Sequence, residues 1–109
     1  YSEGLANSQG AASSICGQFG GTLATLQDAD ENALVQSLLT APAWTGGYHD
    51  TGTTWLWSGA QAMTWENWAG GAAPSGSGGQ CLVLDEQSGQ WSADACTVVR
   101  PFVCEQPAF

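Results

Sequence analysis

Apolar positions in the first part of the chain recur three or four residues apart, the spacing of a helix. The apolar residues that share one face of segment 8–19 are Ala11, Ala12, Ile15, Cys16 and Phe19. Gly20 and Gly21 follow this segment, and glycine readily adopts the positive φ at which many helices end. The pattern therefore predicts a helix that buries Cys16 and ends at the glycine pair.

A second helix is predicted to begin at Asp28. Aspartate is a favourable N-cap, and Glu31 stands three positions later, where it completes a variant of the capping box. The acidic residues of this turn also suit the positive end of the helix dipole. The segment 40–42 contains a proline that breaks the pattern. The stripe expected to face the core consists of Leu34, Val35, Leu38 and Leu39.

The remaining chain alternates short apolar runs with glycine- and serine-rich segments, which is typical of short strands joined by loops. In segment 54–57 the period of two places Trp55 and Trp57 on one face and Leu56 on the other. Residues 69–80 form a glycine-rich stretch without a charged group, interpreted as a long loop of the kind that often bears binding residues. The expected strands lie at Trp44, 54–57, 81–84, 90–92 and 101–104.

Length and composition indicate a single small domain over residues 1–109, with 43% hydrophobic residues. Ten acidic residues stand against one cation, Arg100, which gives a net charge of −9. Such a charge repels phosphate backbones and acidic membrane surfaces, so nucleic-acid binding is excluded. No apolar run is long enough for membrane insertion. The acidity serves solubility, with cation or sugar binding by some carboxylates as the alternative.

The chain has four cysteines, and no two are spaced as Cys-x-x-Cys. This spacing argues against a zinc knuckle or a thioredoxin-like site. An even number of widely spaced cysteines in a small glycine-rich chain fits an oxidising compartment, so a secreted, extracellular protein is expected. The sequence alone leaves three disulfide pairings open.

Several segments, taken in order, resemble the C-type lectin-like family. They are the run 20–25 (GGTLAT), the capped helix at 28–31, 44–47 (WTGG), 57–59 (WSG), 65–68 (WENW) and 101–105 (PFVCE). The resemblance extends from Ala11 to Glu105. It implies an α+β fold, in which two helices flank small antiparallel sheets with a long loop region and two disulfides. It also implies a binding module rather than an enzyme, and no sequence signature of a known catalytic site is present.

The resemblance further implies the disulfides Cys16–Cys104 and Cys81–Cys96. The first would tie the first helix to the last strand, and the second would close a shorter loop beside the long one. The chain looks like the short form of the fold, which lacks an N-terminal hairpin and a third disulfide.

Family members that bind sugar through calcium have a Glu-Pro-Asn or Gln-Pro-Asp triplet in the long loop, a glutamate just before the third cysteine and an Asn-Asp pair after the last tryptophan. Here the triplet reads Ala73-Pro74-Ser75, Gly79 stands at the glutamate position, and the pair reads Ser92-Ala93, with Asp94 one place late. Calcium takes six to eight oxygen ligands, with carboxylates prominent among them. The standard calcium site is therefore predicted to be lost, and no cofactor is expected to be required.

Other polar residues near the expected Cys81–Cys96 loop could bind a glycan directly. These candidate ligand-binding residues are Ser75, Gln80, Asp85, Glu86, Ser92 and Asp94. Among the six tryptophans, Trp55 and Trp65 are the candidate stacking platforms, although a core position is favoured for both. His49 and Asp50 are a candidate pair for calcium or zinc at a non-standard site, since histidine suits zinc and Asp50 falls near an auxiliary calcium position of relatives.

The sequence therefore predicts a secreted lectin that binds glycans, with microbial cell-wall polysaccharide in innate defence as the expected target. A protein-binding module without sugar binding and an ice-binding protein are the alternatives. A homo-oligomer would add avidity to a weak single site, although no coiled-coil segment is present.

Overall fold

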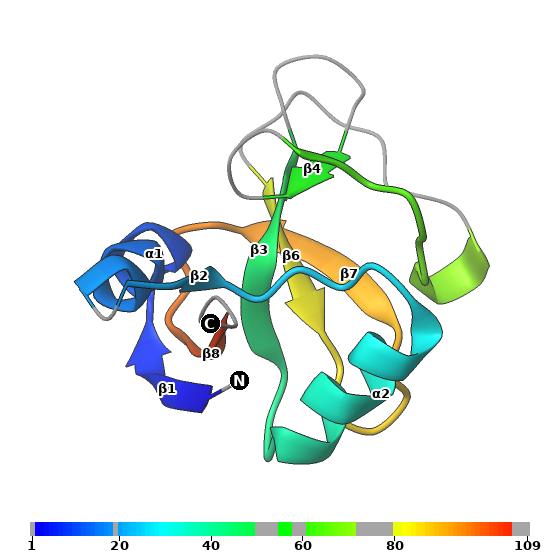
Figure 1. Cartoon of the computed structure of the whole chain (residues 1–109), viewed down its shortest axis with the longest axis horizontal. Coiled ribbons are helices and arrows are strands. Elements are labelled where there is room, and N and C mark those ends of the chain that lie inside the picture. Colours follow the sequence, from blue (N-terminus) through cyan, green and yellow to red (C-terminus); the bar gives the residue numbers. More distant parts are fainter. Residues whose placement is uncertain (1, 19, 50–54, 58–60, 72–79, 106–109) are drawn as a thin grey trace.

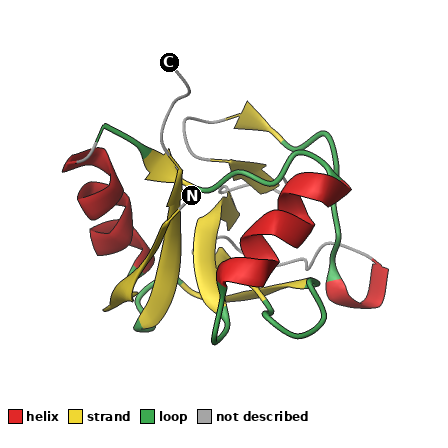
Figure 2. Cartoon of the chain, turned by 60° about the horizontal axis from the view of Figure 1, so that its bottom comes forward, coloured by secondary structure: helices red, strands yellow, loops and turns green. Residues whose placement is uncertain are grey.

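The computed structural model describes residues 2–18, 20–49, 55–57, 61–71 and 80–105. Two α-helices lie beside a branched sheet (Figures 1 and 2), which confirms the predicted α+β architecture. The described elements are β1 (Ser2–Asn7), α1 (Gln9–Gln18), β2 (Thr22–Leu23), α2 (Ala29–Leu38), β3 (Ala43–His49), β4 (Trp55–Trp57), β5 (Gln61–Ala62), the 3₁₀ turn η1 (Ala69–Gly71), β6 (Gln80–Leu84), β7 (Trp91–Ala95) and β8 (Arg100–Glu105).

The described strands join into one branched sheet. Its main path runs β1-β8-β3-β4-β5, while β2 also pairs with β8, and β6 lies between β3 and β7. The pairs are antiparallel except where β3 and β8 run parallel at Trp44 and Phe102. Strand β1 was not predicted, because its sequence SEGLAN lacks a clear apolar alternation. It pairs Ser2 with Cys104, so the two ends of the described chain lie side by side.

Helix α1 agrees with the prediction. Ala12 and Cys16 are buried, and Gly20 has a φ of 78°, the left-handed conformation expected after the helix. The side-chain oxygen of Ser8 accepts a hydrogen bond from Ala11 N at 3.4 Å near the helix start. Phe19, also expected on the buried face, lies outside the described residues.

The predicted start of α2 is confirmed in detail. Asp28 caps the helix, and its Oδ1 accepts a hydrogen bond from Glu31 N at 2.8 Å. Glu31 Oε1 in turn accepts from Gln27 N at 3.0 Å, one residue before the position of the usual capping box. Both hydrogen bonds satisfy backbone N–H groups at the N-terminus of α2.

The predicted apolar stripe of α2 is wrong in part. Val35 and Leu39 are buried, but Leu34 and Leu38 are 52% and 40% exposed. Asn32 is only 5% exposed instead and completes the inward face. The helix is therefore rotated relative to the prediction, which counted only apolar residues and so could not include a buried asparagine.

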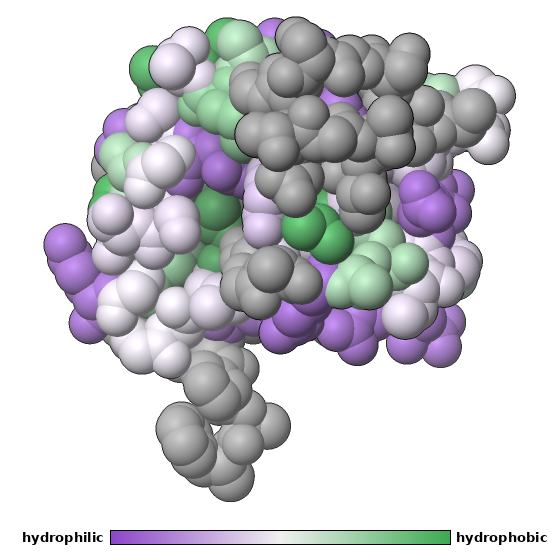
Figure 3. Space-filling view, turned by 90° about the horizontal axis from the view of Figure 1, so that it is seen from above, coloured by the Kyte–Doolittle hydropathy of each residue, from purple (hydrophilic) through white to green (hydrophobic). Residues whose placement is uncertain are grey.

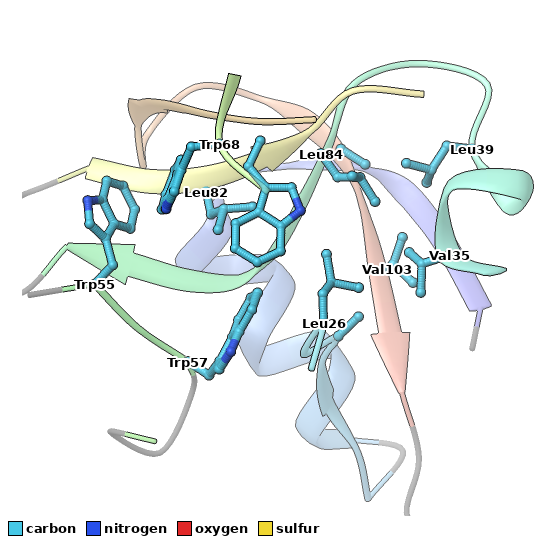
Figure 4. Packing of buried hydrophobic residues seen from close by; sticks show 12 residues of the cluster. Leu26, Val35, Leu39, Trp55, Trp57, Trp68, Leu82, Leu84 and Val103 are labelled. Atoms are coloured by element: carbon cyan, nitrogen blue, oxygen red, sulfur yellow. The ribbon is translucent and has the colours of Figure 1, made fainter. Parts of the chain in front are cut away.

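Two clusters of buried side chains form the core. One contains most of the tryptophans, and Trp91 lies at its centre, with the rings of Trp57, Trp65 and Trp68 5.4–5.6 Å away and nearly perpendicular to it. Figure 4 shows tryptophans at one end of this cluster and aliphatic side chains, including Val35 of α2, toward the other. The second cluster packs α1 against Trp44 and neighbouring strands.

Both disulfides implied by the resemblance are confirmed. Cys16 of α1 is bonded to Cys104 of β8, with their Cα atoms 5.5 Å apart and a sequence separation of 88. Cys81 of β6 is bonded to Cys96, just after β7, with a sequence separation of 15. The first bond holds α1 on the sheet, and the second joins β6 to the turn that follows β7.

Candidate functional site

A hollow of about 400 Å³ opens beside Trp68. The described residues that line it are Glu66, Asn67, Trp68 and Gly71, which belong to the segment between β5 and the end of η1. Seen from above, the described surface intersperses hydrophobic and hydrophilic side chains without a continuous apolar band (Figure 3). The hollow brings a carboxylate, an amide and an indole together, which is a polar lining on a rigid aromatic base.

The carboxylate of this hollow is oriented by an indole. Trp68 is buried against Trp55 and Trp91, with ring centroids 4.7 and 5.4 Å away, and its Nε1 donates to Oε1 of Glu66 at 2.7 Å. A hydrogen bond to an ionised acceptor is stronger than a neutral one. Glu66 is itself exposed, and its second oxygen, Oε2, accepts no hydrogen bond from the described residues.

The neighbouring amide is fixed by a network that reaches α2. Asn67 Nδ2 donates to Gly89 O at 2.7 Å, and Asn32 Nδ2 donates to the same oxygen at 2.9 Å. Asn32 Oδ1 accepts from Trp91 Nε1 at 2.7 Å, and Trp91 N donates to Asn67 O at 2.9 Å. Four residues from three parts of the chain thus hold the wall of the hollow, which is the support that a preformed site needs.

The two tryptophans considered as stacking platforms have different surroundings. Trp55 is 5% exposed and belongs to the core. Trp65 is half-buried, and its ring packs edge-on against Trp91 at 5.6 Å. The other four tryptophans, Trp44, Trp57, Trp68 and Trp91, are all buried.

The described candidate ligand residues do not gather at one place, and Ser75 lies outside the described residues. Register pairs Ser92 with Val83 and Asp94 with Cys81, and side chains of antiparallel partners share a face. Ser92 and Asp94 therefore face the α1 side of the sheet, away from the cluster that contains Trp91. Gln80 pairs with Ala95 on the other face.

Asp94 is held by the single arginine of the chain. Arg100 Nη2 donates to Asp94 Oδ2, and the guanidinium lies 5.6 Å from the ring centroid of Trp44. The hydrogen bond from Arg100, together with the N–H of Ala95, lowers the pKa of Asp94 below its ordinary value. In this arrangement the ion pair connects the end of β7 to the start of β8 across the turn between them.

Acidification should therefore weaken the fold through Asp94. Because its folded-state pKa lies below the ordinary value of 3.8, the ionised form stabilises the fold above that pH, and this contribution is lost as the pH falls through the folded-state pKa. We expect Asp94→Asn to make the urea midpoint less dependent on pH between about 5 and 2.5. Arg100→Met should flatten the profile in the same way. An unchanged profile in both variants would show that the ion pair is not the source.

Asp85 and Glu86 belong to the turn after β6. Asp85 Oδ2 accepts from the hydroxyl and the N–H of Ser88 at 2.7 and 2.8 Å, and these hydrogen bonds lower the pKa of Asp85. The backbone oxygen of Glu86 accepts from Gln36 of α2 at 3.2 Å. Both residues thus shape a turn that packs on α2, and Ser75 lies outside the described residues. A ligand-binding role for these residues stays a prediction.

The candidate metal pair is only partly described. His49 is 4% exposed, its ring lies 5.1 Å from that of Trp55, and neither ring nitrogen has a hydrogen-bond partner among the described residues. Asp50 lies outside those residues. Within the described ranges, no three His, Cys, Asp or Glu side chains are grouped as metal ligands. A zinc or calcium ion at His49 and Asp50 stays a prediction.

The described residues also lack ligands of the standard calcium site found in family members that bind sugar through calcium. Ala93 has no side-chain oxygen, and Asp94 turns to Arg100 on the other face of β7. The two loop positions, 73–75 and 79, lie outside the described residues.

Sequence reasoning did not single out Glu66 and Asn67 as candidate ligands. The only signal was their position in the run WENW, between two tryptophans. Polar residues between two core tryptophans are held close to the core by their neighbours, and this position could have identified Glu66 and Asn67 as candidates.

Comparison with known proteins agrees with the fold described above. The model of the lectin C-type domain family matches residues 6–106. C-type mannose receptor 2 of Homo sapiens is 29% identical over 96 residues, which cover 84% of this chain and 6% of the receptor. The chain spans 3% to 6% of the length of the first curated relatives that it matches.

Solved structures show the same fold. A calcium-independent type II antifreeze protein has a TM-score of 0.85 at 20% identity, over 95% of this chain and 82% of the other. The cow C-type carbohydrate-recognition domain of CD23, determined in the presence of a GlcNAc2Man3 oligosaccharide, has a TM-score of 0.85 at 22% identity, over 98% and 86% of the two chains. Among the described residues, no helix is both long and apolar enough to cross a bilayer.

Proposed function

Because this chain belongs to the C-type lectin domain family, we propose that it is a secreted module that binds microbial surface glycans in innate defence, without the family's standard calcium site. The observation that carries this proposal is the hollow beside Trp68, where Glu66 and Asn67 are held in fixed positions. The proposed role is binding and not catalysis.

The lining of the hollow suits a sugar. Glycans present hydroxyl groups that donate hydrogen bonds, and carboxylate and amide oxygens are good acceptors for them. Oε2 of the exposed Glu66 can accept from such a donor, while Oε1 accepts a hydrogen bond from Nε1 of Trp68. A small number of well-placed polar groups on a preformed base is the usual composition of a ligand site.

Two further observations support the proposal. A structural neighbour, the cow CD23 domain, was determined with an oligosaccharide present, so this fold is compatible with glycan recognition. Two disulfides among the described cysteines fit an oxidising environment outside the cytosol.

Mannan, β-glucan and peptidoglycan fragments provide the direct test by titration calorimetry. We expect at least one of them to bind, and the affinity to be the same with calcium and with a chelator. Glu66→Ala removes the exposed acceptor and should weaken binding about tenfold, the effect of losing a hydrogen bond to a charged group. Asp30→Ala is the matched control, because Asp30 is an exposed acid on α2, and it should bind as the native chain does.

Absence of binding to every polysaccharide, with calcium, zinc or neither, would contradict the proposal. Capture of a specific protein partner that sugars do not displace would favour the protein-binding alternative. Altered ice-crystal growth without glycan affinity would favour an ice-binding role.

A further inference from the structure

We propose that the hollow beside Trp68 prefers glycans with free, protonated amino groups, such as glucosamine oligomers, over their N-acetylated and acidic counterparts. The inference rests on the proposed glycan-binding function and names the class of ligand for the same hollow.

The first argument is the balance of hydrogen-bond donors and acceptors. The indole N–H of Trp68 is used by Glu66, one amide hydrogen of Asn67 is used by Gly89 O, and Gly71 N donates to Trp68 O at 2.9 Å. Among the described lining residues, the free side-chain atoms that remain include two acceptor oxygens, Glu66 Oε2 and Asn67 Oδ1, against one amide hydrogen. A ligand that contacts these side chains therefore acts mainly as a donor toward them.

The second argument is charge. Glu66 is the charged residue among the described residues of the lining, and the chain has no lysine and one arginine, Arg100. That arginine is engaged by Asp94, whose side chain lies on the face of β7 opposite the Trp91 cluster. The carboxylate of Glu66 therefore has no cationic partner among the described residues, in a chain with a net charge of −9.

These two features together select a protonated amine. An ammonium group donates hydrogen bonds and carries the compensating positive charge, and charge-assisted hydrogen bonds of this kind are the stronger ones. Acetylation of the same nitrogen leaves a single neutral N–H. A uronic or sialic acid would bring a second negative charge against Glu66 and is rejected by repulsion.

The test compares a glucosamine tetramer, its fully N-acetylated counterpart and a uronic-acid-containing tetramer, under buffer conditions in which the amines are protonated. We expect the native chain to bind the amine form about tenfold more tightly than the acetylated form, and the acidic form not measurably. Glu66→Gln keeps an acceptor for the Trp68 indole but removes the charge, so it should abolish the preference. Asp30→Asn removes one negative charge from an exposed position on α2, and this variant should retain the preference for the amine form.

Equal affinity of the native chain for the amine and acetylated tetramers would overturn this inference and leave the proposed function standing. A preference for the amine form that survives in Glu66→Gln would show that Glu66 is not its source and would also overturn the inference. Equal loss of the preference in Asp30→Asn would assign the preference to the overall charge of the chain, with the same consequence. Failure of all glycans to bind would instead remove the proposed function itself. Glu66→Ala provides the same readout if the glutamine variant does not fold.

Discussion

Replacement of Cys16 and Cys104 by alanine is expected to lower the free energy of unfolding by about 4–5 kcal/mol. The disulfide joins residues separated by 88 positions, so in the loop-entropy model its loss frees most of the unfolded chain. The physical attachment of α1 to β8 is lost as well. Since small domains have a total stability of about 5–15 kcal/mol, the variant should be marginally folded. Urea unfolding followed by tryptophan fluorescence measures the change.

The second disulfide is the internal control for this prediction. Cys81 and Cys96 close a loop with a sequence separation of 15, for which the same model gives about 3 kcal/mol. The alanine pair at these positions should therefore remain more stable than the pair at Cys16 and Cys104. The opposite order would show that local packing around Cys81, and not chain entropy, sets the contribution of these bonds.

Asn32→Leu is expected to destabilise the chain by about 2–3 kcal/mol, although it places an apolar residue of similar size in the core. The substitution leaves the buried indole N–H of Trp91 without its acceptor and takes one of two donors from Gly89 O. A buried donor without a partner costs more than a hydrogen bond normally contributes. Because Gly89 O also positions Asn67, glycan affinity should decline with stability. Thermal unfolding and glycan titration measure the two effects.

Leu34→Asn is the matched control on the same helix. Leu34 is 52% exposed, so an asparagine there should change stability by less than about 0.5 kcal/mol. The two substitutions exchange the same residue types in opposite directions at positions two residues apart. If Leu34→Asn were the more damaging one, the inward face of α2 would be the one predicted from apolar residues alone.

The helices were predictable because their signals are local. The cap of α2 needs only Asp28 and Glu31, three residues apart, and α1 is marked by apolar spacing and a terminal glycine. The rotation of α2 was not predictable, because Asn32 is buried only by virtue of Gly89 and Trp91, 57 and 59 positions away. Strand β1 is likewise specified by its partner β8 and not by its own sequence.

The candidate site was predicted less well, for a related reason. Asp85 and Asp94 look like free acids in the sequence, yet each is bound to a residue three or six positions later, Ser88 and Arg100. Glu66 was not recognised as a candidate from the sequence, because its orientation depends on the hydrogen bond from the Trp68 indole and on the packing of Trp68 against Trp91. Side-chain partnership, and not residue type, decides which acids are available to a ligand.

The pairing of Ser2 with Cys104 has a consequence for larger architectures. Where the first and last segments of a domain lie next to each other, the domain can be inserted into a longer chain without a linker that has to span the domain. Duplication of such a domain would place several copies along one polypeptide while each kept its own compact fold, and if the proposed glycan binding holds, the copies would raise the avidity of the whole chain.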